Sequence, residues 1–280
     1  VAAQHVPELR QLVEAGAAEE AADGRIRPRF GEWAVVGVAL FYALLLIFAP
    51  LAALAQGALS RGIEIFFREV TTPDALSSLK LTFVLAVGAT AINTVFGVAI
   101  AWLLVRDKRF PGRRIVNGIV DLPFAVSPVI VGLALILVWG RDGWFGSTEV
   151  IFSTPGMVLA TIFVSLPFVV REVLPVLEEE GDDQEQAAAT LGARGWQVFW
   201  RITLPTIRWG LTYGVILATA RAIGEFGAVA VVSGKIQGRT ETLTLYVEDR
   251  FQSLDLTGAY AAGVVLALLG VTVLALMTLL

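Results

Sequence analysis

The chain contains no cysteine, and its single histidine is His5, in the polar stretch at the N-terminus. This composition argues against disulfide bonds, thiolate catalysis and histidine-ligated metal sites. Lysine is scarce as well, and the nearest approach to a phosphate-binding loop is at Lys235, where Ile236 follows in place of the required serine or threonine. We therefore expect no ATP site and no cofactor in this chain, so that any ATP and its magnesium would be bound by a partner.

Charged residues make up only 16% of the 280 residues, whereas hydrophobic residues make up 56% and the mean hydropathy is +0.74. A soluble domain of this length would be much more polar. The composition therefore indicates a polytopic membrane protein. The net charge of −4 is small and argues against a nucleic-acid partner.

Six apolar runs are long enough for the roughly 20 residues that an α-helix needs to cross a bilayer. We expect an all-α protein with a polar N-terminal tail at residues 1–32 and a transmembrane domain at 33–280. The predicted spans are residues 33–55, 79–105, 115–138, 155–177, 209–232 and 256–280.

Lysine and arginine are unevenly distributed between the connections of these spans. They are more frequent in the tail, in the second connection and in the fourth connection than in the other three. Because basic residues are retained on the cytoplasmic side, this bias predicts that both termini and the fourth connection are cytoplasmic.

The fourth connection, residues 178–208, is a polar island between long apolar runs. If Ala188 and Gly192 share a helix, they form a stripe of small residues beside Leu191 that allows another protein to approach closely. A second short helix would follow a bend at Gly192 and Gly195, with aromatic residues on one face and polar residues on the other, a pattern typical of a helix at a membrane surface, and Pro205 would end it. The residues that give this stretch its spacing are Glu185, Gln186, Ala187, Ala188, Leu191, Gly192, Ile202, Leu204 and Pro205.

The fourth connection opens with closely spaced carboxylates between Glu178 and Glu185. Such a cluster could bind a metal. We favour a different role, in which Asp182 or Asp183 caps the first helix, because negative charge is stabilised at a helix N-terminus.

Two ionisable residues lie in the fifth predicted span, where a charge needs compensation. Arg221 and Glu225 are four residues apart and can pair across one helical turn. The pair could border a translocation path, in which Arg221 would contact an oxyanion, or it could be a structural ion pair that neutralises itself.

The third predicted span holds Asp121, Ser127 and Pro128, together with Pro123. Prolines interrupt the helical hydrogen bonds, so this segment either lines a pathway as a discontinuous helix or is a kink stabilised by its neighbours. In the second span, Asn93 predicts a hydrogen bond between helices.

The spacing of the fourth connection resembles the cytoplasmic coupling loop of ABC importer permeases. Their consensus reads Glu-Ala-Ala, three residues, Gly, nine residues and Ile-x-Leu-Pro, and here Gln186 stands at the position of the glutamate, with Glu185 just before it. The resemblance implies a type I ABC importer permease fold in the cytoplasmic (inner) membrane, and a loop that docks on a separate ATPase.

Residues 121–133, 155–172 and 220–238 further resemble the CysW family of sulfate permease subunits. This implies uptake of sulfate or thiosulfate together with a sister permease of the CysT kind, two copies of a CysA-like ATPase and an extracytoplasmic sulfate- or thiosulfate-binding protein. The stretch Gly224-Glu225-Phe226-Gly227 is also similar to molybdate permeases, so a molybdate or tungstate importer is an alternative. A secondary anion transporter is a further alternative, but it would have no use for the coupling loop. A membrane-embedded enzyme is another, but no histidine or cysteine lies in a predicted span to act as a nucleophile or metal ligand.

Overall fold

The computed structural model describes residues 30–107, 109–146 and 150–279, and the regular elements in these ranges are helices. The chain divides into two units, with the boundary after Ala53. The first unit contains most of α2 (Phe30–Leu59), whose side chains from Trp33 to Ala53 are exposed. The predicted tail lies almost entirely outside the described residues.

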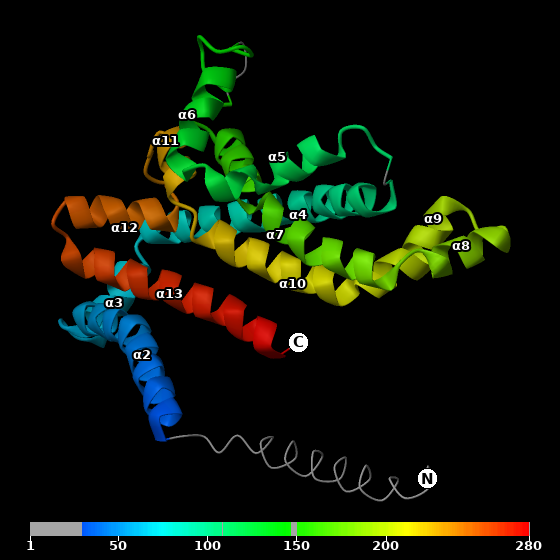
Figure 1. Ribbon diagram of the computed structural model, residues 1–280. Coiled ribbons are helices and arrows are strands. Elements are labelled where there is room, and N and C mark those ends of the chain that lie inside the picture. Colours follow the sequence, from blue (N-terminus) through cyan, green and yellow to red (C-terminus); the bar gives the residue numbers. More distant parts are fainter. Residues whose placement is uncertain (1–29, 108, 147–149, 280) are drawn as a thin grey trace, which may run out of the picture. The chain divides into compact units, whose positions relative to one another are not determined.

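The second unit is a bundle of helices joined by short connections (Figure 1). Its longest helix starts where Thr72 Oγ1 accepts a hydrogen bond from the Ala75 amide and Pro73 occupies the first turn, a position that proline favours. The elements are α3 (Ile63–Val70), α4 (Pro73–Arg106), α5 (Arg113–Ala125), α6 (Pro128–Trp139), α7 (Thr154–Glu180), α8 (Asp183–Thr190), α9 (Gly195–Val198), the π-helical turn η1 (Phe199–Thr203), α10 (Leu204–Ile223), α11 (Gly227–Val232), α12 (Leu243–Gln252) and α13 (Leu256–Leu279).

Among the described residues, four helices (α2, α4, α7 and α13) are long and apolar enough to cross a membrane. The number rises to five if the bent pair α5–α6 is counted as one span. α5 and α6 meet at 118°, so the discontinuity predicted from the prolines is confirmed. The fifth predicted span is not one helix, because α10 ends at Ile223 and α11 begins at Gly227. Six crossings therefore remain a prediction. The short helices α3 and α12 were not predicted.

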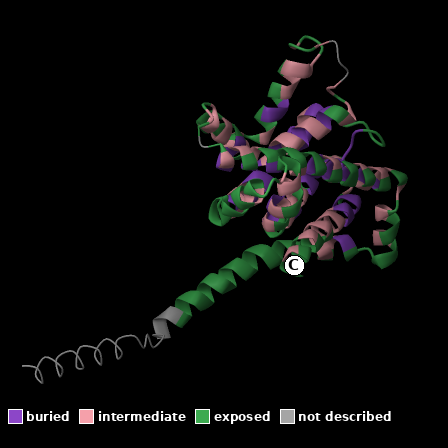
Figure 2. Ribbon diagram, turned by 90° about the vertical axis from the view of Figure 1, so that its right-hand side faces the viewer, coloured by how far each residue is buried: buried purple, intermediate pink, exposed green. Residues whose placement is uncertain are grey.

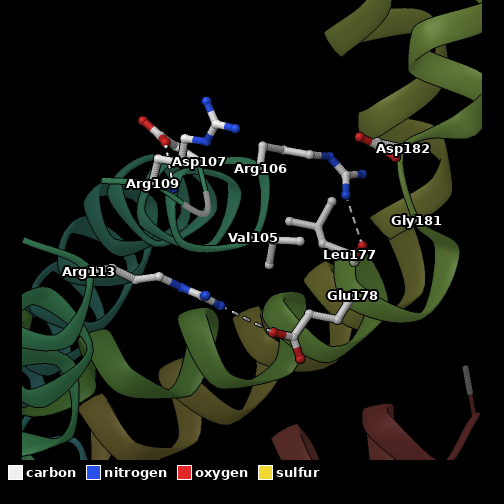
Figure 3. A pocket seen from close by; sticks show the side chains of 9 residues that line it. All are labelled: Val105, Arg106, Asp107, Arg109, Arg113, Leu177, Glu178, Gly181 and Asp182. Atoms are coloured by element: carbon white, nitrogen blue, oxygen red, sulfur yellow. Dashed lines mark hydrogen bonds and ion pairs between the residues drawn. The ribbon is translucent and has the colours of Figure 1, made fainter. Parts of the chain in front are cut away.

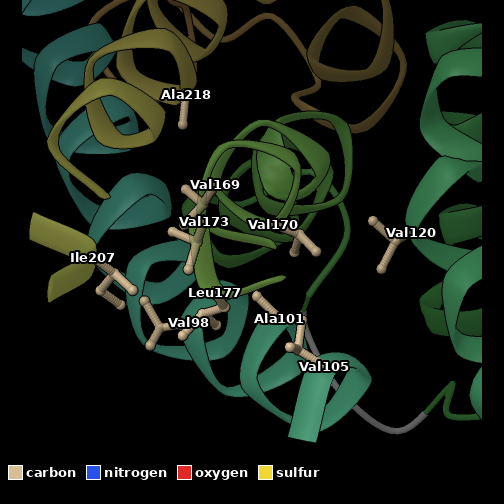
Figure 4. Packing of buried hydrophobic residues seen from close by; sticks show 10 residues of the cluster. All are labelled: Val98, Ala101, Val105, Val120, Val169, Val170, Val173, Leu177, Ile207 and Ala218. Atoms are coloured by element: carbon tan, nitrogen blue, oxygen red, sulfur yellow. The ribbon is translucent and has the colours of Figure 1, made fainter. Parts of the chain in front are cut away.

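The main core of the second unit lies where α4, α7 and α10 pack together (Figure 4). Small residues allow this approach: a Cβ atom on Gly97 would lie 2.8 Å from Val169 Cγ1, and one on Gly214 would lie 3.1 Å from Val169 Cα. Close helix packing explains these two glycines, whereas Gly88 faces open space. Asn93 Nδ2 donates to Ile162 O at 3.0 Å and to Ser165 Oγ at 2.9 Å, which confirms the predicted bond between helices.

Buried residues line the interior of the second unit, whereas many large apolar side chains lie on its surface (Figure 2). Phe83, Val95 and Phe96 on α4, for example, are exposed. This distribution suits a bundle surrounded by lipid, because hydrocarbon solvates such side chains as well as a protein core does.

Candidate functional site

The fourth connection forms a hairpin of short helices that projects from the end of α7 (Figure 1). α8 ends at Thr190, and Gly192 turns the chain with φ +85°, a conformation that glycine adopts without strain. The Leu191 amide donates to Ala187 O at 3.3 Å and the Ala193 amide donates to Ala188 O at 3.0 Å, so the turn closes the helix end. Gly192 thus lies in the turn and not on the helix, and the predicted stripe shared with Ala188 is wrong.

The second half of the hairpin is continuous with the helix that follows it. α9 leads into the π-helical turn η1, and η1 leads directly into α10. Pro205 lies directly after the π-helical turn, and the helical backbone continues through it into α10, so it does not end the helix as predicted. Ile202 and Leu204 are half-buried at this junction.

The hairpin carries large apolar side chains on its surface. Leu191 is 90% exposed, and Trp196 and Trp200 are more than half exposed. Gln186 and Ala187 are exposed beside them, and Ala188 is half-buried. A cluster of this kind on a polar loop is typical of a surface that another protein covers.

Glu185 points inward and anchors the hairpin to the bundle. Arg106, the last residue of α4, donates from Nε to Glu185 Oε2 at 2.9 Å and from Nη2 to Oε1 at 3.0 Å, and Thr203 Oγ1 donates to Oε1 at 2.8 Å. Arg106 Nη1 also donates to Leu177 O at 3.1 Å near the end of α7 (Figure 3). We call Arg106, Glu185 and Thr203 the loop anchor. The sequence identified Glu185 but not its two partners, since only the fold brings them together.

The acidic stretch before α8 does not cap the helix through a side chain. Asp182 occupies the N-cap position but its carboxylate makes no capping hydrogen bond, so this part of the prediction is wrong. Asp183 and Glu185 lie in the first turn, where the positive end of the helix dipole stabilises their negative charge. Within the described residues, no group of three or more acidic, histidine or cysteine side chains could hold a metal ion.

The charged pair of the fifth predicted span forms as expected. Arg221 Nη1 lies 2.6 Å from Glu225 Oε2, and Glu225 is 3% exposed. Glu225 lies between α10 and α11, where its Oε1 accepts from the Ala228 amide at 2.9 Å and its carbonyl accepts from Thr244 Oγ1 at 2.9 Å. The carboxylate therefore stabilises the break in the helix, which favours the structural interpretation of the pair.

Asp121 joins the two helices α5 and α7. Its Oδ1 accepts from Arg171 Nε at 2.8 Å, and Arg171 Nη2 donates to Asn117 Oδ1 at 3.1 Å. Ser127 and Pro128 form the junction between α5 and α6. A Cβ atom on Gly227 would lie 3.0 Å from Pro128 Cβ, so the break after α5 packs against the break after α10.

Comparison with known proteins identifies the family. Residues 93–280 match the model of the family "Binding-protein-dependent transport system inner membrane component". The chain belongs to this family. It is 50% identical over 251 residues to the sulfate transport system permease protein CysW of Synechocystis sp., covering 88% of this chain and 91% of that protein. It is 43% identical over 251 residues to CysW of Escherichia coli K12, covering 88% and 86% of the two chains.

The sulfate transport system permease protein CysT of Synechocystis sp. is more distant, at 37% identity over 248 residues, covering 85% of this chain and 86% of that protein. Among solved structures, a bacterial ABC transporter that imports alginate matches with a TM-score of 0.73 and 17% identity, covering 88% of this chain and 93% of that chain. The chain therefore has the type I ABC importer permease fold, and it is a permease subunit.

Proposed function

We propose that this chain forms half of the translocation pathway of an ATP-driven importer of sulfate and thiosulfate. Its identity of 43 to 50% with CysW proteins over most of the chain carries the choice of cargo. The partners we propose are a CysT-like sister permease, two copies of a CysA-like ATPase and an extracytoplasmic binding protein. Both termini would be cytoplasmic in the bacterial inner membrane.

The hairpin at residues 178–208 would be the coupling loop. Its exposed apolar side chains Leu191, Trp196 and Trp200 would enter a groove on the ATPase, because large apolar side chains supply most of the free energy of docking. Closure of two ATP-bound ATPases would move the hairpins together. The continuity of η1 with α10 and the hydrogen bonds of Arg106 to Glu185 would carry that movement into the bundle. The bundle would then open alternately to the two sides of the membrane.

The first experiment is ATP-dependent uptake of labelled sulfate into vesicles that contain this chain, the sister permease, the ATPase and the binding protein. We expect uptake that requires ATP and this chain, and that unlabelled thiosulfate suppresses far more than molybdate does. Suppression mainly by molybdate would reassign the cargo. Uptake that does not depend on ATP would contradict the proposal and favour a secondary transporter.

Docking is tested separately by Leu191→Asp. This side chain is exposed, so the permease should insert normally while the ATPase binds at least about 30-fold more weakly, the loss expected for a central apolar contact. The matched control is Leu254→Asp, because Leu254 is 84% exposed between α12 and α13, far along the chain from the hairpin. Copurification of the ATPase with both variants at the level of the unmodified protein would contradict the assigned docking surface.

A further inference from the structure

A basic hollow lies between the first turns of α5 and the second half of α7. Its volume is about 760 Å³, and it neighbours the hollow drawn in Figure 3, with which it shares Arg113 and Glu178. The polar side chains that line it are Arg113, Arg114, Asn117, Arg171 and Glu178, and we call this set the basic hollow.

Positive charge exceeds negative charge in the basic hollow. Three guanidinium groups line the hollow, and two carboxylates balance part of their charge: Asp121 pairs with Arg171, and Glu178 comes no closer than 3.9 Å, to Arg113 Nη2, which leaves one positive charge in excess. Both side chains of that pair are roughly half exposed, so their attraction is weak. Arg114 is exposed and makes no hydrogen bond or ion pair within the described part of the chain. Guanidinium donors therefore remain available to a ligand.

Arg171 is held in place by its neighbours. Its Nε donates to Asp121 and its Nη2 donates to Asn117 at 3.1 Å, which fixes the plane of the guanidinium at the wall of the hollow. A guanidinium that is already oriented loses less conformational entropy when it binds an anion. The hollow thus combines one ordered arginine with two adaptable ones.

The start of α5 adds to the same electrostatic field. α5 has 13 residues, begins at Arg113 and receives no side-chain capping bond, since its N-cap residue is Gly112. The first-turn amides and the positive end of the helix dipole favour an anion at this position. The positive end of α5 adds to the positive potential of the three arginines, and the inference depends on the arginines.

We propose that the basic hollow binds a tetrahedral oxyanion. Guanidinium groups bind such anions through paired charge-assisted hydrogen bonds, and several donors around one cavity suit three or four anion oxygens. The anion is either free sulfate that reaches this face of the bundle or the phosphate of an anionic lipid headgroup. The choice of sulfate and of the cytoplasmic face rests on the proposed function, whereas the chemistry of the hollow does not.

The test is hydrogen exchange on the assembled transporter in nanodiscs, with the backbone amides of residues 112–118 as the reporter. Inorganic sulfate is titrated against sodium chloride at equal ionic strength, in nanodiscs of phosphatidylcholine and in nanodiscs that also contain phosphatidylglycerol. If free sulfate occupies the hollow, sulfate slows exchange in phosphatidylcholine and chloride does not. If a lipid phosphate occupies it, phosphatidylglycerol gives the protection without sulfate and sulfate adds nothing.

Arg114→Gln should raise the half-saturating concentration of sulfate, or of phosphatidylglycerol, about tenfold or more, the loss expected for one charge-assisted contact. Arg109→Gln is the matched control, because Arg109 is an exposed arginine of the same connection that does not line the hollow, and it should leave the midpoint unchanged. Equal exchange in chloride and sulfate in both lipids, or equal effects of the two variants, would overturn the proposal.

ATP-dependent sulfate uptake by the same preparations separates this inference from the proposed function. Protection by sulfate without sulfate uptake leaves the oxyanion site standing and refutes the cargo. Normal uptake without protection in either lipid refutes the site and leaves the cargo standing.

Discussion

The loop anchor gives the sharpest test of how the hairpin is coupled to the bundle, through the substitution Glu185→Gln. Glu185 accepts three short hydrogen bonds, two from Arg106 and one from Thr203, and both charged side chains are mostly buried, at 13% exposed for Arg106 and 16% for Glu185. An amide of the same shape removes the charge and turns one acceptor into a donor that faces the guanidinium.

The magnitude follows from these contacts. A hydrogen bond to a charged group contributes about 1.5 to 3 kcal/mol, and the three bonds share one carboxylate, so their energies do not add. We therefore expect the substitution to cost about 2 kcal/mol, the value for one such bond. This lowers the ratio of anchored to unanchored hairpins about 30-fold. Folding of the bundle should persist, because the core of α4, α7 and α10 does not include Glu185.

The assay compares the rate of sulfate uptake with the rate of ATP hydrolysis in the same vesicles. We expect Glu185→Gln to lower uptake about tenfold or more while ATP hydrolysis falls much less, so that the number of ATP molecules consumed per sulfate rises. Thr203→Val removes one of the three bonds and should have a smaller effect in the same direction. Glu179→Gln is the control, since Glu179 is exposed and makes no hydrogen bond or ion pair within the described residues.

A double variant tests whether the two charged groups act as a unit. Arg106→Gln combined with Glu185→Gln should cost much less than the sum of the single substitutions, because each single change leaves a buried charge without its partner. Additive losses, or an unchanged ratio of ATP hydrolysis to uptake in Glu185→Gln, would refute the reasoning.

Three further predictions concern single positions. Gly192→Ala should weaken ATPase copurification, because φ is +85° there and a Cβ atom costs about 1 kcal/mol. Gly195→Ala should not, because Gly195 is the first residue of α9, its φ is not positive and a Cβ atom would meet free space; equal copurification of the two variants would contradict this prediction. Arg221→Gln should destabilise the permease by about 3 to 5 kcal/mol in thermal unfolding, because the buried carboxylate of Glu225 loses its partner. Adding Glu225→Gln should restore most of that stability, and a double variant as unstable as Arg221→Gln would contradict the prediction. Burial, reinforced by nearby acidic groups, raises the pKa of Glu241 from 4.5 to about 7. Between pH 4.5 and about pH 7 the folded protein therefore keeps a proton that the unfolded chain has released, so the melting temperature should fall as the pH rises through this range. Glu241→Gln should make the melting temperature less dependent on pH.

Much of the coupling loop could be predicted from local patterns. The spacing from Gln186 to Pro205 located the hairpin, and the glycine at residue 192 marked its bend correctly. The role of Pro205 was predicted wrongly because a proline can either end a helix or begin the next one, and only the path of the backbone distinguishes the two.

The sequence by itself determined the class of the protein, since the apolar runs, the interrupted third span and the pair of Arg221 with Glu225 are all properties of neighbouring residues. The tertiary structure decided which distant residues meet. Arg106 and Glu185 are 79 positions apart, and Asp121 and Arg171 are 50 apart, so no periodicity in the chain links them. These contacts form because α7 packs closely against both α4 and α5 and carries α8 at its end, and side-chain partners that are far apart in the sequence are set by packing and not by local preference.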